Sequence, residues 1–216
     1  MWRFFVSPTL LLLVLMLHPL KAFSTASAHP VGGTELYDHY RYSILLYYGI
    51  TVSDPLTRIL QGEIHRWPEQ IQSIELDYTL DEANFLRRLV KPLVSIVQFA
   101  GDFTVRGGAN QPIIYELDPY FAFRWANWCW NDRVSTSLAV GEGISYVTSI
   151  PSLENKHHHH TKRLLNFLML EATLASPLYP RFQGVIRIHH RSGAYGLYQA
   201  GNTGSNDIGL GLRYLF

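Results

Sequence analysis

The sequence has little cysteine and little net charge, and its amino-terminal part lacks an apolar run long enough for a membrane-spanning helix. Cys129 is its single cysteine, so no intramolecular disulfide can form and a disulfide framework is excluded. The 18 Lys and Arg residues nearly balance the 17 Asp and Glu residues, which leaves a formal charge of +1 at pH 7. Proteins that bind nucleic acid normally carry a basic stripe, so no nucleic acid is expected as a partner.

The amino-terminal apolar run is short. It extends from Leu10 to Leu17, whereas a membrane-spanning helix needs about 20 apolar residues. Arg3 precedes the run and the small residues Ala26-Ser27-Ala28 follow it, an order typical of a cleaved secretory signal peptide. We therefore predict a signal peptide over residues 1–28 and a single domain over residues 29–216, since the remaining length and uniform composition suit one domain.

Apolar and polar residues alternate along most of the remaining chain, which is typical of β-strands. Eight strands are expected, over residues 40–50, 73–80, 97–103, 115–125, 134–147, 163–175, 182–192 and 208–216. Residues 163–175 are apolar on both faces, so a helix is an alternative there. Residues 81–92 are long for a tight turn, so the bounds of the second and third strands are the least determined. Glu142 lies between two glycines and suggests a bulge that turns its carboxylate inward.

Three features favour strands whose apolar face points to lipid. Trp125, Trp128 and Trp130 cluster at the end of the fourth strand, as in an interfacial aromatic girdle. The opposite faces collect charges of both signs that can pair in a narrow lumen, namely Glu116, Asp118, Arg124, Glu171, Arg187 and Arg213. The last strand ends at Phe216 and resembles the recognition signal of bacterial outer-membrane barrels. The expected fold is all-β, an eight-stranded antiparallel transmembrane β-barrel of the outer membrane; a soluble barrel that binds a small lipid inside is the alternative.

The expected topology places a polar pair on the outside of the barrel. An even strand count puts both termini on the periplasmic side, so the seventh strand runs outward. His190 and Ser192 then lie at its extracellular end on the lipid face, whereas His189 has lumenal parity. A histidine and a serine two residues apart on one face are neighbours, as a general base and its nucleophile must be. The alternative is a polar cap that meets the lipid headgroups.

A third member of such a site is expected from the eighth strand. Asn206 has the parity of the lipid face and Asp207 that of the lumen, so only Asn206 points toward His190 without a bulge. The run Lys156 to His160 could bind a transition metal, but such a run is more often a solvated loop tip. No metal or cofactor is assigned.

The last thirty residues resemble a known family. His190-Arg191-Ser192-Gly193-Ala194, then Asn202-Thr203-Gly204-Ser205-Asn206, then the strand to Phe216, are similar to the outer-membrane lipid A 3-O-deacylases of the PagL type. That family consists of eight-stranded barrels with a Ser-His-Glu triad on the exterior. Two positions depart from its pattern, because Asn206 stands where the family has Glu and Gly193 where it has Asn.

The resemblance implies a set of roles. Ser192 would be the nucleophile, His190 the general base, Asn206 the third member and Asn202 an oxyanion donor. The reaction would hydrolyse the 3-O-linked acyl chain of lipid A, without metal or cofactor, in the outer membrane of a Gram-negative cell. The implied partners are lipopolysaccharide of the outer leaflet and the outer-membrane assembly machinery, through the terminal strand. The rival interpretation is a non-catalytic barrel that serves as a structural protein, an adhesin or a lipopolysaccharide-binding module.

Overall fold

A computed structural model describes residues 32–157, 161–200 and 203–216. The predicted signal peptide lies outside the described residues. No helix in the described part of the chain is long and apolar enough to cross a membrane.

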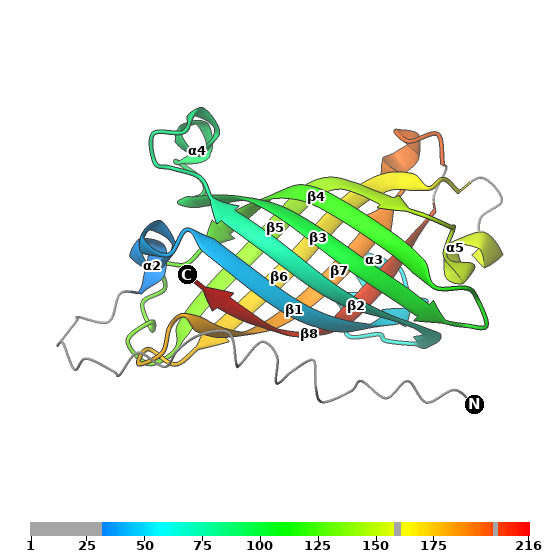
Figure 1. The fold of residues 1–216 in the computed structure, drawn as a ribbon, viewed down its shortest axis with the longest axis horizontal. Coiled ribbons are helices and arrows are strands. Elements are labelled where there is room, and N and C mark those ends of the chain that lie inside the picture. The colour runs from blue at the N-terminus through cyan, green and yellow to red at the C-terminus, as the bar shows by residue number, and fades with distance from the viewer. Residues whose placement is uncertain (1–31, 158–160, 201–202) are drawn as a thin grey trace.

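The strands of the described residues close into one barrel in the order β1 to β8, and every neighbouring pair is antiparallel (Figure 1). The predicted all-β barrel and its count of eight strands are confirmed. The bounds are β1 Tyr42–Val52, β2 Arg66–Thr79, β3 Ile96–Gly108, β4 Ile114–Trp125, β5 Ser135–Val147, β6 Leu164–Ala175, β7 Phe182–Ser192 and β8 Gly204–Leu215.

Three strands extend by several residues beyond their predicted bounds at the barrel end away from helix α4 (Phe85–Val90) and the carboxyl terminus. β2 begins at Arg66, β3 continues to Gly108, and β8 begins at Gly204. The helix considered for residues 163–175 is wrong, because they form β6. The long connection after β2 contains helix α4.

The bulge predicted at Glu142 is also wrong. The register between β5 and β6 runs without a shift through this position, and the Glu142 side chain is exposed on the outside of the barrel. The two flanking glycines have another role, since a Cβ at Gly141 would lie 2.7 Å from the Tyr120 ring. They make room inside the barrel for that ring rather than marking a bulge.

The barrel is apolar outside and charged inside. The outward face of β1 carries Tyr42, Leu46 and Tyr48, each about half exposed, while inward-facing Arg124 and Arg187 are fully buried. This distribution is the reverse of that in a soluble barrel, whose outer surface must be solvated. It excludes the soluble alternative and identifies a transmembrane β-barrel. The six charged residues predicted to gather in the lumen are all buried.

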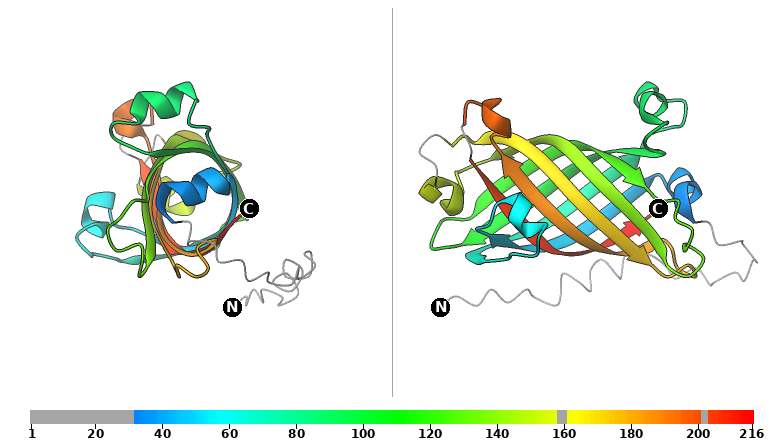
Figure 2. Two further views of the ribbon diagram at one scale, coloured as in Figure 1. Left: turned by 90° about the vertical axis from the view of Figure 1, so that its left-hand side faces the viewer. Right: turned by 180° about the vertical axis from the view of Figure 1, so that it is seen from behind.

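Short helices lie at both ends of the barrel. Helix α2, Gly33–His39, sits in the mouth on the side of the carboxyl terminus, as seen along the barrel axis in Figure 2. Its Leu36 and Tyr37 are buried against the ends of β3 and β8. At the opposite end lie α3 (Leu56–Ile59), α5 (Ser152–His157) and the 3₁₀ turn η1 (Ala194–Gly196). The loops after β1, β5 and β7 therefore form the end of the barrel opposite helix α2.

Candidate functional site

The β7–β8 register brings His190 and Asn206 together on the barrel exterior. The two residues are direct partners across the strands, and His190 Nδ1 lies 2.6 Å from Asn206 Oδ1. The structure therefore places in contact the two residues that strand parity paired.

The orientation of the Asn206 amide is determined by its second contact. Its Nδ2 donates a hydrogen bond of 2.9 Å to the backbone carbonyl of Asp54, so Oδ1 is the atom that faces the imidazole. Because a carbonyl oxygen can only accept, His190 Nδ1 must carry the proton and donate it. The lone pair is then on Nε2, which is the arrangement that a general base requires.

The loop between β1 and β2 covers Asn206 and is held by Asp54. The Asp54 carboxylate accepts hydrogen bonds from the backbone nitrogen of His65 at 2.5 Å and from its Nδ1 at 2.9 Å. These bonds to the charged form lower the pKa of Asp54 below its usual value. Asn206 is only 6% exposed under this loop. Sequence reasoning missed Asp54, because its role depends on a backbone carbonyl that any residue could supply.

Ser192 is the last residue of β7 and has the same outward parity as His190. Within the described part of the chain, its hydroxyl is not hydrogen-bonded to the imidazole. Its partner in β6 is Asn166, which also faces outward and was not singled out from the sequence. The sequence did contain a signal for Asn166, because it is a lone polar residue on an otherwise apolar strand face, which is unusual in a lipid-facing position. Asn166 brings an amide next to the serine.

Two predicted features are not described by the structure. Asn202, the predicted oxyanion donor, lies outside the described residues, as do His158 to His160 of the histidine run. His157 ends helix α5. Gly193 directly precedes the turn η1 and has no side chain that could act beside Ser192.

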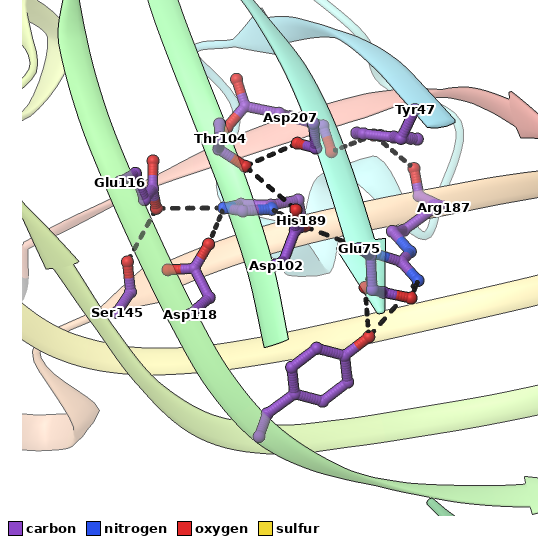
Figure 3. A network of polar contacts seen from close by, with 12 residues as sticks. Tyr47, Glu75, Asp102, Thr104, Glu116, Asp118, Ser145, Arg187, His189 and Asp207 are labelled. Atoms are coloured by element: carbon purple, nitrogen blue, oxygen red, sulfur yellow. Dashed lines mark hydrogen bonds and ion pairs between the residues drawn. The ribbon is translucent and has the colours of Figure 1, made fainter. Parts of the chain in front are cut away.

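The second group of polar residues lies inside the barrel. Arg187 lies against Glu75 in Figure 3 and donates to it at 2.5 and 2.7 Å. It also donates to Glu171 at 2.5 and 2.9 Å. His189 has the predicted lumenal orientation, is fully buried, and lies 3.1 Å from Glu116 Oε1 through its Nε2. Its ring packs against Phe167. The interior is thus a hydrogen-bonded ionic network separated by the barrel wall from His190 and Ser192.

The closed sheet, its apolar exterior and its ionic interior define the chain as an eight-stranded outer-membrane-type β-barrel. No protein-family profile and no curated protein matches the sequence.

Similar solved structures belong to outer-membrane and surface proteins. The outer membrane enzyme PagL is 15% identical with a TM-score of 0.49, covering 80% of this chain and 98% of its own. Neisserial surface protein A is 10% identical with a TM-score of 0.46, covering 81% and 96%. Ail of Yersinia pestis, in a phospholipid bilayer nanodisc, is 15% identical with a TM-score of 0.38, covering 81% and 99%.

Proposed function

We propose that this barrel is an esterase of the outer membrane that removes the 3-O-linked acyl chain of lipid A. The observation that carries the proposal is the bond from His190 Nδ1 to Asn206 Oδ1, with the amide held by Asp54. It prepares Nε2 as a base on the outside of the barrel, on the same strand face as Ser192. The PagL-type pattern around His190, Ser192 and the downstream asparagines supports the choice of substrate.

In the proposed reaction, Ser192 Oγ attacks the ester carbonyl while His190 Nε2 takes the hydroxyl proton. The protonated imidazole then gives this proton to the departing sugar oxygen, and the acyl group stays on the serine. Water, deprotonated by the same Nε2, hydrolyses the acyl-enzyme and releases a 3-hydroxy fatty acid. Asn206 acts as a positioning residue, because it fixes the imidazole but carries no charge to stabilise imidazolium.

The proposed oxyanion donor is an asparagine amide. Asn202 has this role in the family pattern. Asn166 is a second candidate, because directly opposed residues on one sheet face have Cβ atoms about 4.5–5.5 Å apart and Asn166 is directly opposed to Ser192. Either amide would stabilise the negative oxygen of the tetrahedral intermediate.

The substrate reaches the site from the side. His190 and Ser192 lie at the strand end away from helix α2 and the carboxyl terminus, which by the topology of such barrels would be the extracellular end. Lipid A of the outer leaflet would meet them without leaving the membrane. The proposed location is accordingly the Gram-negative outer membrane, after export with a cleaved signal peptide and assembly through the terminal strand.

Mass spectrometry of lipid A tests this proposal. Cells that produce the wild-type chain should lose the 3-linked acyl chain, and cells that produce Ser192→Ala should keep it. Thr136→Val is the matched control. It also removes a hydroxyl, but near the start of β5, at the opposite end of the barrel from Ser192, so cells that produce it should show the wild-type lipid A pattern. A folded wild-type chain that leaves lipid A intact would refute the deacylase proposal.

Asn206 itself favours a second candidate function. A neutral amide in place of the family's carboxylate, together with Gly193 after the serine, is what a barrel that kept the scaffold but lost turnover would show. Such a chain would be a structural protein, an adhesin or a lipopolysaccharide-binding module. Unmodified lipid A that copurifies with the folded chain would favour the binding module.

A further inference from the structure

Three buried ligand-type side chains converge inside the barrel. Asp102 of β3 and Asp118 of β4 are direct partners across the strands, and His189 of β7 lies beside them (Figure 3). One ligand atom from each lies within 4.8 Å of the other two. All three side chains are fully buried.

Several atoms of this group lack hydrogen-bond partners. They are both carboxylate oxygens of Asp118, Oδ2 of Asp102 and Nδ1 of His189. The nearest guanidinium group is that of Arg187, whose Nη1 lies 3.6 Å from Asp102 Oδ2, beyond hydrogen-bonding distance, and His189 Nε2 lies 3.8 Å from Asp118 Oδ2. Buried carboxylates are normally paired or bound to a metal, because desolvation of an isolated charge is costly. The three side chains therefore offer buried acceptor atoms that a cation would satisfy.

The interior as a whole also has fewer positive than negative side chains. Among the described residues, nine buried carboxylates lining or capping the lumen face five buried guanidinium groups: Glu69, Glu75, Asp77, Asp102, Glu116, Asp118, Glu154, Glu171 and Asp207 against Arg106, Arg124, Arg187, Arg191 and Arg213. The arginines are committed elsewhere, since Arg106 bonds Glu116 and Asp207, and Arg213 bonds Glu75 and Glu171. A doubly charged cation beside Asp102 and Asp118 would reduce the excess where it is least compensated.

We propose that Asp102, Asp118 and His189 bind one divalent transition-metal ion of the Zn²⁺ or Mn²⁺ type. An imidazole nitrogen with two carboxylates suits these ions, whereas Mg²⁺ and Ca²⁺ prefer oxygen ligands alone.

Glu116 holds His189 in the tautomer that can bind a metal ion. His189 Nε2 donates to Glu116 Oε1 at 3.1 Å, so the lone pair is on the unpartnered Nδ1. A carboxylate behind a metal-binding histidine is the usual supporting arrangement.

The site requires a small contraction. Ligand bonds of about 2.0–2.2 Å correspond to ligand separations of roughly 3–3.6 Å, so the three side chains would close by about an ångström when they bind the ion. The ion would join β3 and β4 to β7 across the lumen. Its role is structural, because the barrel wall separates it from Ser192 and His190.

The histidine run at His157 to His160 could itself bind metal, so the test uses the full chain with these four residues replaced by glutamine, beside the native chain. Both are refolded into detergent micelles with EDTA, Zn²⁺, Mn²⁺ or Mg²⁺, passed through gel filtration and analysed for bound metal. We expect one Zn²⁺ or Mn²⁺ per chain after the histidine run is replaced, no retained Mg²⁺, and a thermal midpoint several degrees above that of the EDTA sample.

Two variants separate the site from the general charge of the lumen. Asp118→Asn and His189→Gln should each abolish both the bound metal and the thermal shift. Asp77→Asn is the matched control, since Asp77 is another buried lumenal carboxylate with an unpartnered oxygen but lies outside the group, and it should retain both. A folded barrel that binds no Zn²⁺ or Mn²⁺ once the histidine run is replaced would overturn the proposal. Metal retained by Asp118→Asn and His189→Gln would overturn it too.

Discussion

At the scale of single residues, the contact between His190 and Asn206 decides which imidazole nitrogen can act as a base. The Asp54 carbonyl orients the Asn206 amide, and the amide oxygen in turn holds the proton on His190 Nδ1. A carboxylate would do the same and would also stabilise imidazolium electrostatically. The expected activity is therefore that of a correctly oriented but electrostatically unassisted base.

Removing the acceptor at Asn206 tests this orientation. Asn206→Leu has a similar size but cannot hold the imidazole tautomer, so we expect turnover of lipid A to fall by about a hundredfold or more. Asn206→Asp keeps an acceptor oxygen and should retain activity. Initial rates on purified lipid A in micelles measure both, and equal rates for Asn206→Leu and wild type would contradict the assignment of Asn206 as a positioning residue.

At the scale of elements, the loop from β1 to β2 and the seam from β1 to β8 hold the site together. The loop carries the Asp54 carbonyl that orients Asn206, and His65 anchors the Asp54 side chain. The seam brings β8 into the sheet, with Val52 opposite Asn206 at the end of the barrel that carries the site. Both features act on Asn206 from the side away from His190.

The loop should be released only in strong acid. Hydrogen bonds from His65 lower the pKa of Asp54, so the stability that they add is present above the unfolded value of about 3.9. That stability is lost as the pH falls through the lower folded pKa. NMR of the Asn206 side-chain amide in micelles should show a shift in this acid range, and Asp54→Asn should remove the step. A step that persists in Asp54→Asn would have another origin.

The seam should not tolerate a side chain at Gly209. A Cβ there would clash with the Tyr48 carbonyl and lie 2.6 Å from Gly49 Cα. We expect Gly209→Ala to impair closure and reduce the fast-migrating folded band in heat-modifiable gel electrophoresis. Gly101→Ala is the control, since a Cβ at Gly101 meets nothing within 4 Å. Equal amounts of folded band in the two variants would contradict this view of the seam.

At the scale of the whole molecule, the barrel is held by a continuous ionic network inside an apolar wall. Arg187 contacts Glu75 and Glu171 and lies near Asp102, so it links carboxylates from three different strands. Such a network stabilises the fold only while both signs are present, because each group is costly to bury alone.

Arg187→Met should therefore be strongly destabilising. The variant leaves Glu75 and Glu171 with fewer positive partners in a buried interior, and we expect a loss of about 3–5 kcal/mol in the free energy of unfolding. Arg58→Met, which removes an exposed ion pair with Glu63, should change it by less than about 1 kcal/mol. Urea unfolding in lipid vesicles measures both, and similar values for the two variants would contradict the role of the network.

The local pattern of side chains determined the number of strands, their faces and their orientation toward lipid. Period-two alternation is a local property, so residues such as Ile44 and Ser43 can be assigned to opposite faces from the sequence alone. The same rule separated Asn206 from Asp207 and His190 from His189. Where the alternation was interrupted by the glycines around Glu142, the predicted bulge was wrong.

Only closure of the barrel decided which residues meet. Asn166 opposite Ser192, Asp54 above Asn206, and His189 beside Asp102 and Asp118 all join segments that are distant in the chain. Strand register and the curvature of the closed sheet set these contacts, and neither is encoded in the spacing of any one segment. The sequence by itself thus determined whether each strand residue faces the lumen or the lipid, and the tertiary structure decided which residues it contacts.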